Sequence, residues 1–241
     1  MAPHKGPSFK IERYFAPYEF IAKYHLCCSD CEPLSLQELL ELADSECRTL
    51  YSSLVLSYTE SSGHPLLRKQ ICESYFTTLS PENVLVCCPE EGIFIAMQAL
   101  LSPGDHVICM MPGYQSLYEL ARSNGCEVSF WTGEESVINE EEGVARWEFK
   151  LEELEKLIRP STRLLIVNFP HNPTGYLPTP QMLLQVVDLS RRRNLFVFSD
   201  EMYRFLEAPG RQRLPSLADL YEHAVSLSGV SKSLSLPGTA L

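Results

Sequence analysis

The feature of this sequence that most constrains its fold is a regular alternation of short apolar runs with helical patterns, from residue 84 to residue 227. Each run has roughly four to six residues, which is typical of a buried strand and too short for a helix. Strands separated by helices favour a mostly parallel sheet with helices on both faces. We expect strands at 84–88, 107–111, 127–131, 164–168, 195–199 and 224–227.

The helical patterns between these runs have recognisable ends. Ser35 and Glu38 form a capping box that opens a helix. Thr179 and Pro180 supply an N-cap and a first-turn proline to another. The stretch 134–156 holds nine glutamates, which favours a solvated loop followed by a helix face. Further helices are expected at 64–76, 93–101, 118–123 and 151–158.

The balance of charged residues argues against two classes of binding partner. The chain has 20 Lys and Arg against 31 Asp and Glu, a formal net charge of -11. This balance speaks against nucleic-acid binding and against a polybasic membrane tether. No apolar run approaches the roughly 18 residues of a membrane span, and the first twenty residues lack the apolar core of a signal peptide. We therefore expect a cytoplasmic protein with no nucleic-acid or membrane partner.

The nine cysteines fit a reducing compartment, because their number is odd and several lie in apolar runs. Cys28 and Cys31 have the spacing of a zinc knuckle, and Cys27 precedes them. No second Cys or His pair lies at a suitable distance, so we expect reduced thiols and no metal site.

Three common α/β ligand sites are absent from the sequence. No two of the twelve glycines are separated by a single residue, which excludes the dinucleotide-binding fingerprint. No glycine precedes Lys and then Ser or Thr in the frame of a phosphate-binding loop. The Gly-x-Ser-x-Gly elbow of acyl-transfer enzymes is also missing.

Polar motifs instead follow three successive strands, and the carboxyl ends of parallel strands meet at one edge of a sheet. Asn168 begins Asn-Phe-Pro-His-Asn-Pro-Thr-Gly. Ser199 begins Ser-Asp-Glu-Met-Tyr, and Ser226 begins Ser-Leu-Ser-Gly-Val-Ser-Lys-Ser. An amide, a carboxylate, a phenol and an amine are thereby expected at a common edge.

These motifs, in this order, resemble the class I/II aminotransferases, which are fold-type I pyridoxal-phosphate enzymes. The resemblance extends from about residue 58 to residue 238. It implies a three-layer α/β fold with the mostly parallel sheet of the large domain of these enzymes. Residues 1–50 then form an irregular and helical N-terminal arm with part of the small domain. Residues 51–241 form a truncated cofactor-binding large domain, and the C-terminal small domain is missing.

The resemblance also implies the roles of the residues around the cofactor, pyridoxal 5'-phosphate. Lys232 matches the lysine that binds the cofactor's aldehyde and moves the substrate's α-proton. Asp200 matches the carboxylate that keeps the ring nitrogen protonated; the neighbouring Glu201 is the alternative and is expected to point away. Asn172 and Tyr203 match the two donors to the ring's phenolic oxygen.

Further positions match residues around the ring face and the phosphate. Tyr114 resembles the aromatic residue that stacks on the ring, and a core tyrosine is the alternative. Tyr58 resembles the tyrosine that reaches the phosphate of a neighbouring subunit, which implies a homodimer. The phosphate is expected at a helix N-terminus, where this chain has Pro89 and Glu90 instead of a Gly- or Ser-rich turn. Ser231 remains available to bind it, so the phosphate site is expected to be altered and not absent.

The end of the sequence departs most from the family pattern. Leu236, Pro237 and Gly238 follow it, but Ala240 stands where the family has a phosphate-binding arginine. We expect a truncated product that is weak or inactive alone.

Three functions stay open at this stage. The first is amino-group transfer between an amino acid and a 2-oxo acid. The second is another reaction of the same cofactor, such as elimination, cyclisation or decarboxylation. The third is a non-catalytic truncated isoform that acts as a dimer partner.

Overall fold

A parallel sheet forms the centre of the larger of two units into which this chain divides in a computed structural model. The first unit comprises Met1–Cys28 and Pro89–Ser228, and the second comprises Ser29–Cys88 and Gly229–Leu241. The structure describes residues 8–139 and 144–239.

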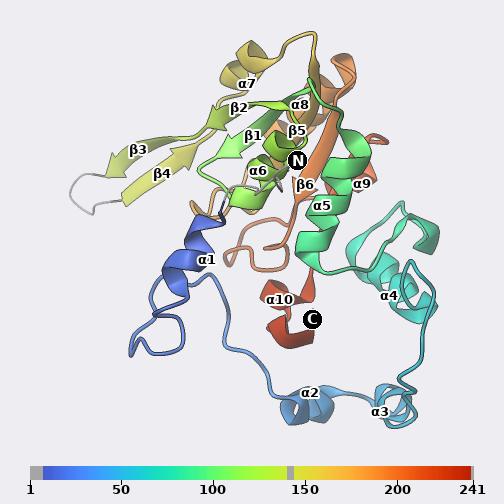
Figure 1. Ribbon diagram of the computed structural model, residues 1–241. Helices are drawn as coiled ribbons and strands as arrows, with labels where there is room; N and C mark the ends of the chain where they lie inside the picture. The colour runs from blue at the N-terminus through green and yellow to red at the C-terminus, as the bar shows by residue number, and fades with distance from the viewer. Residues whose placement is uncertain (1–7, 140–143, 240–241) are drawn as a thin grey trace, which may run out of the picture. The chain divides into compact units, whose positions relative to one another are not determined.

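The sheet has five strands in the order β2-β1-β5-β6-β7, and every neighbouring pair is parallel. Figure 1 shows them as arrows in the first unit. Their positions confirm five of the six expected strands within two residues at each end. The strands are β1 (His106–Met111), β2 (Glu127–Thr132), β5 (Thr162–Asn168), β6 (Phe196–Asp200) and β7 (Ala224–Leu227).

Helices cover both faces of this sheet, because successive strand residues face opposite sides. Val107 and Cys109 pack in one apolar cluster with residues of α5 (Pro89–Leu100) and α6 (Gln115–Ser123). Ile108 and Met110 pack in another with residues of α7 (Leu151–Leu157), α8 (Pro180–Arg192) and α9 (Leu217–Leu220). This arrangement confirms the expected three-layer α/β fold.

The helix ends follow their sequence signals. The Thr179 side chain accepts a hydrogen bond from the Met182 N–H, so α8 has the expected N-cap. In the second unit, Ser35 and Glu38 form the expected capping box before α2 (Leu36–Leu42). No helix among the described residues is both long and apolar enough to cross a membrane.

Two expected elements are wrong. Residues 84–88 are not a strand, since no strand among the described residues pairs with them; the Val86 N–H instead donates to the Ser62 carbonyl at 2.9 Å. The glutamate-rich stretch is not all loop and helix, because it contains the antiparallel strands β3 (Glu134–Asn139) and β4 (Val144–Glu148). In Figure 1 this hairpin projects beyond β2.

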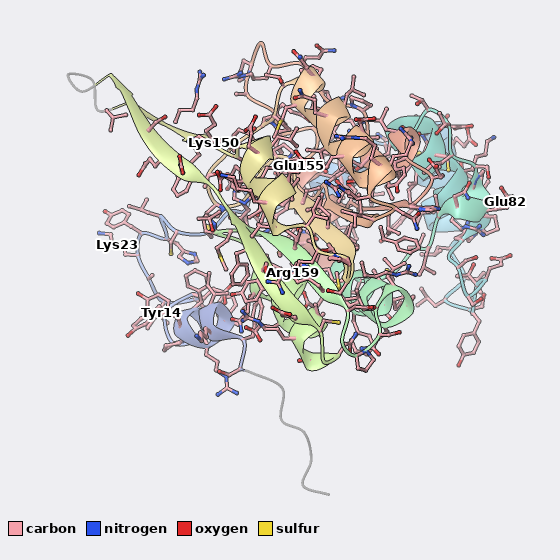
Figure 2. All side chains as sticks on the ribbon, turned by 90° about the horizontal axis from the view of Figure 1, so that it is seen from above. Tyr14, Lys23, Glu82, Lys150, Glu155 and Arg159 are labelled. Atoms are coloured by element: carbon pink, nitrogen blue, oxygen red, sulfur yellow. The ribbon has the colours of Figure 1, made fainter. Side chains whose placement is uncertain are left out.

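Ion pairs around α7 lie on the surface. Figure 2 labels Lys150, Glu155 and Arg159 there. Lys150 pairs with Glu134 at 2.5 Å, and Arg159 pairs with Glu127. Because these side chains are largely exposed, their ion pairs contribute little to stability, and the apolar clusters hold the sheet together.

The second unit is helical. Its backbone links two distant stretches, since the Leu34 N–H donates to the Ser235 carbonyl at 3.1 Å. Its remaining elements are α3 (Ser45–Ser52), α4 (Pro65–Tyr75), η1 (Pro81–Asn83), α10 (Val230–Ser233) and η2 (Pro237–Thr239).

Candidate active site

Three neighbouring strands end level with one another, and this register builds the candidate site. Asn168, the last residue of β5, pairs with Asp200, the last residue of β6. Asp200 in turn pairs with Leu227 at the end of β7. Because the strands are parallel, the loops that follow them leave from one edge of the sheet. The polar motifs after β5 and β6 are therefore neighbours.

The side chain of Asn168 connects the ends of β5 and β6. Its Nδ2 donates to the backbone carbonyl of Asp200 at 2.8 Å, and its Oδ1 accepts from the Asn172 N–H at 2.7 Å. Asn168 is buried, so both bonds are shielded from water. The amide thereby fixes the loop that carries Asn172 against the end of β6.

Asn172 and Tyr203 form a pair of polar groups at this edge. The Asn172 Nδ2 donates to the Tyr203 hydroxyl at 3.1 Å. Both side chains are partly buried, and both can donate hydrogen bonds to a third group. The structure thus brings together two donors from loops that follow different strands.

Asp200 is a buried carboxylate without a cationic partner. It is 6% exposed, and none of the salt bridges between described residues involves it. Its Oδ1 accepts one hydrogen bond, from the Met202 N–H at 3.1 Å. Burial, together with the nearby charge of Glu201, raises the pKa of Asp200 to about 6. A ligand cation beside this carboxylate would relieve the cost of its burial.

Glu201 lies in a different environment, although it is the next residue. Its Oε1 accepts hydrogen bonds from the Ser216 hydroxyl at 3.0 Å, the Leu217 N–H at 3.0 Å and the Ser226 hydroxyl at 2.8 Å. Its other oxygen lies 3.8 Å from Arg204 Nη1. Burial still raises the pKa of Glu201. This carboxylate has a structural role in joining the segments before α9 and along β7.

The phenol of Tyr114 is affected by three acidic side chains of the first unit, Glu90, Glu12 and Asp200. It is the N-cap residue of α6, and its ring packs edge-on against Phe9 with centroids 5.2 Å apart. Burial raises the pKa of the Tyr114 phenol, and the Glu90 carboxylate raises it further through its charge and a hydrogen bond. Asp200 adds a smaller effect. The phenol therefore faces a negatively charged part of the first unit, which disfavours its ionisation.

The first turn of α5 is unusual for an anion-binding helix end. Such ends bind anions through free backbone N–H groups. Pro89 opens the helix and has no N–H, while Glu90 and Glu91 place two carboxylates in the same turn. This turn offers one donor fewer, and more negative charge, than the Gly- or Ser-rich turn of the expected pattern.

The other candidate residues belong to the second unit. Lys232 lies in α10, is partly buried and forms an ion pair with Asp30. Ser231 precedes it in the same helical turn, and Tyr58 lies fully exposed in the loop between α3 and α4. Ala240 lies outside the described residues.

The sequence reasoning assigned no role to Asn168 or His171. Asn168 ends a buried strand, where an amide must find partners, and this was the available signal. His171 is 3% exposed beside Asn172, and burial lowers its pKa to about 4. Nothing in the local sequence distinguishes this histidine from an exposed loop residue.

One protein family matches most of the chain. The family described as "Aminotransferase class I and II" matches residues 25–241. Kynurenine--oxoglutarate transaminase 3 of Mus musculus is 29% identical over 204 residues, which cover 76% of this chain and 42% of that protein. A probable aspartate/prephenate aminotransferase of Thermus aquaticus is 31% identical, over 75% of this chain and 46% of that protein. The chain thus spans less than half the length of these relatives.

Solved structures of pyridoxal-phosphate-dependent enzymes have a fold similar to that of this chain. A PLP-dependent aminotransferase from Streptococcus suis has a TM-score of 0.83 and 31% identity, over 97% of this chain and 60% of its own. A PLP-dependent cyclase, OrfR, has a TM-score of 0.82 and 26% identity, over 99% of this chain and 60% of its own.

Proposed function

Because the chain belongs to the class I and II aminotransferase family, we propose that it binds pyridoxal 5'-phosphate and transfers an amino group between an amino acid and a 2-oxo acid. When bound, this cofactor supplies an aldehyde that reacts with amines and a ring that withdraws electrons from the bonds of the substrate's α-carbon. One observation carries the proposal: Asp200 is a buried carboxylate that forms no salt bridge with any described residue, and its strand end lies next to Asn172 and Tyr203.

The donor set of the first unit fits the ring of this cofactor. Asp200 pairs with the ring nitrogen and favours its protonated form, as a carboxylate in a buried site does. Asn172 Nδ2 and the Tyr203 hydroxyl donate to the phenolic oxygen of the ring. Tyr114 packs on the ring face.

The remaining roles concern the amine and the phosphate. Lys232 would hold the cofactor's aldehyde through Nζ, and its free amine would take up the proton of the substrate's α-carbon. Ser231 donates to the phosphate, and Tyr58 reaches the phosphate bound by a second copy of the chain. Glu90 lies at the phosphate end, where it acts through Tyr114. These roles make the functional form a homodimer, and we place it in the cytoplasm.

A second candidate function is another reaction of the same cofactor. The similarity to the cyclase, with a TM-score of 0.82 over 99% of this chain, favours cyclisation within this class. The two reactions require the same ring-binding residues, since the cofactor supplies the chemistry of both. They differ in the fate of the amino group.

A single-turnover experiment separates these functions. The chain is loaded with pyridoxal phosphate and mixed with one amino acid at a time. Transfer releases one 2-oxo acid per protein and consumes the cofactor's aldehyde, whereas cyclisation leaves the aldehyde intact. Borohydride reduction of the loaded chain, followed by peptide mass mapping, is expected to label Lys232. Labelling of other lysines alone, with no 2-oxo acid from any amino acid, would contradict the proposal.

A further inference from the structure

Gln115, the first residue of α6, binds a segment that lies 105 residues earlier in the sequence. Its Oε1 accepts from the Lys10 N–H at 2.9 Å, and its Nε2 donates to the Ser8 carbonyl at 3.0 Å. The carboxamide therefore uses its acceptor and its donor on the same stretch of backbone. The proposed chemistry assigns no role to this side chain.

The two hydrogen bonds lie on either side of Phe9. This residue is extended, with φ −70° and ψ 103°, and it is the N-cap residue of α1 (Lys10–Phe15). In an extended backbone, a carbonyl and the N–H two residues later point to the same side, which here faces Gln115. The Phe9 carbonyl accepts from the Arg13 N–H at 3.3 Å, in the first turn of α1. The backbone of Phe9 is thus fixed by Gln115 before it and by α1 after it.

The side chain of Phe9 packs on Tyr114, the residue next to Gln115. The ring centroids are 5.2 Å apart and the planes are inclined at 70°, which is the edge-to-face arrangement that aromatic rings favour. Tyr114 also packs against the apolar cluster that contains Val107 and Cys109. One edge-to-face contact occupies at most one face of the Tyr114 ring. The contact with Phe9 is therefore compatible with a ligand on the other face.

We propose that Gln115 is a positioning residue: it fixes the backbone on both sides of Phe9, which holds the Phe9 ring against Tyr114 and so sets the orientation of Tyr114. The inference rests on the proposed function, in which Tyr114 packs on the face of the cofactor ring. A tyrosine ring that is held in place before the cofactor binds loses less rotational freedom on binding. Gln115 and Phe9 contact no reacting atom in this account.

The attachment of the N-terminal segment, residues 8–15, depends on few contacts. Ser8 and Lys10 are exposed, and none of the residues of α1 is buried. Burial of apolar side chains therefore contributes little to holding α1 on the first unit. The hydrogen bonds of Gln115 and the ring contact of Phe9 are local, so that their removal is expected to release the segment without unfolding the sheet.

The first measurement needs no cofactor. Trypsin cleaves after Lys10 when the segment detaches, and mass spectrometry identifies the product. Gln115→Ala is expected to speed this cleavage about fivefold, because both hydrogen bonds to the segment are lost. Gln98→Ala is the matched control, since the Gln98 Nε2 donates to the Asn124 side chain at the other end of α6. Its cleavage rate should stay within about twofold of wild type.

The second measurement is the affinity for pyridoxal phosphate, together with the circular dichroism band of the bound cofactor, which depends on the orientation of neighbouring aromatic rings. Gln115→Ala and Phe9→Ala are each expected to raise the dissociation constant about fivefold and to weaken the band. Phe9→Tyr, which keeps a ring, and Gln98→Ala should stay within about twofold of wild type. Because both alanine substitutions remove one contact, their combination should also cost about fivefold and not about twenty-five-fold.

Each quantity can overturn the inference. An unchanged cleavage rate or an unchanged affinity in Gln115→Ala overturns the inference alone, and so does a loss of about twenty-five-fold in the double variant. If Gln115→Ala does not fold, equal affinities of Phe9→Ala and Phe9→Tyr overturn it. Failure of the wild-type chain to bind pyridoxal phosphate overturns the proposed function and this inference with it.

Discussion

Two adjacent carboxylates at the end of β6 are similarly buried but differ in their hydrogen-bond and charge partners. Asp200 is 6% exposed and Glu201 is 5% exposed. Glu201 accepts three hydrogen bonds from groups of the fold and lies near Arg204, whereas Asp200 accepts one backbone N–H and has no cation beside it among the described residues. Burial alone therefore does not identify a functional acid. The lack of a cationic partner among the described residues is what distinguishes Asp200 from Glu201 and supports its proposed role.

The difference follows from the geometry of a strand end. Successive residues of a strand face opposite sides of the sheet, so an Asp-Glu pair places one carboxylate on each side. Glu201 joins the segments around α9 and β7, while Asp200 faces the side of Tyr114 and Cys109. Glu201 is held by several groups of the fold, whereas the Asp200 side chain accepts a single hydrogen bond, from the Met202 N–H, among the described contacts.

Removal of the Asp200 carboxylate is expected to have the largest effect, and it tests the contrast between Asp200 and Glu201. Asp200→Ala is expected to weaken pyridoxal phosphate binding about a thousandfold, near 4 kcal/mol, because the ring nitrogen loses its buried counter-ion. Fluorescence titration measures the change. Glu201→Gln, which keeps the side-chain shape, serves as the control and should bind within about threefold of wild type. Similar affinities for Asp200→Ala and wild type would remove Asp200 from the site.

Removal of the structural carboxylate is expected to act on folding. Glu201→Ala leaves the Ser216 hydroxyl, the Leu217 N–H and the Ser226 hydroxyl without their acceptor. The free energy of unfolding should fall by about 3–4 kcal/mol, as it does when a buried network loses a charged member. Urea denaturation of the cofactor-free chain measures it. A loss below about 1 kcal/mol would show that the network is not needed.

Neutralisation of Asp200 is expected to stabilise the cofactor-free chain. The pKa of this carboxyl rises from 3.8 to about 6 on folding, so the folded state retains the proton that the unfolded state loses first. The contribution is favourable below about pH 4 and is lost as the pH rises through about 6. Asp200→Asn should therefore match wild type at pH 4 and exceed its stability by about 2–3 kcal/mol at pH 7.5. Equal stability at both pH values would contradict the pKa shift.

Loss of a single donor is expected to have the smallest effect. Tyr203→Phe removes one hydrogen bond to the ring's phenolic oxygen and should weaken cofactor binding about fivefold, with a shift of the absorbance band. Tyr221→Phe is the matched control, because its hydroxyl donates to the Leu195 carbonyl at 2.8 Å in the core. An equal effect of both variants on binding would show a general loss of stability instead.

The sequence predicted which polar residues the sheet brings to one edge. Asp200, Asn172 and Tyr203 follow strands, and parallel strands bring such residues to one edge. The partners of Asn168 and His171 could not be predicted, because they depend on the register of β5 with β6 and on the packing of the imidazole against Phe149. Those are tertiary relations that no local pattern encodes.

The errors in the fold have similar causes. Residues 84–88 have strand composition, but a strand forms only where a partner supplies a ladder of hydrogen bonds, and Val86 bonds to a loop carbonyl. The β3–β4 hairpin lies in a glutamate-rich stretch whose charge hides the alternation of a two-stranded ribbon. In both places the presence or absence of a partner strand determined the structure, and the amino-acid composition did not indicate it.

The protonation state of the cofactor's ring nitrogen reports directly on whether Asp200 lies opposite that nitrogen. Pyridoxal phosphate labelled with ¹⁵N at the ring reports this protonation through its chemical shift when bound to the chain at pH 8. A buried carboxylate opposite the nitrogen predicts the protonated shift in wild type and the unprotonated shift in Asp200→Asn. An unprotonated nitrogen in wild type, or the same shift in both proteins, would contradict the account.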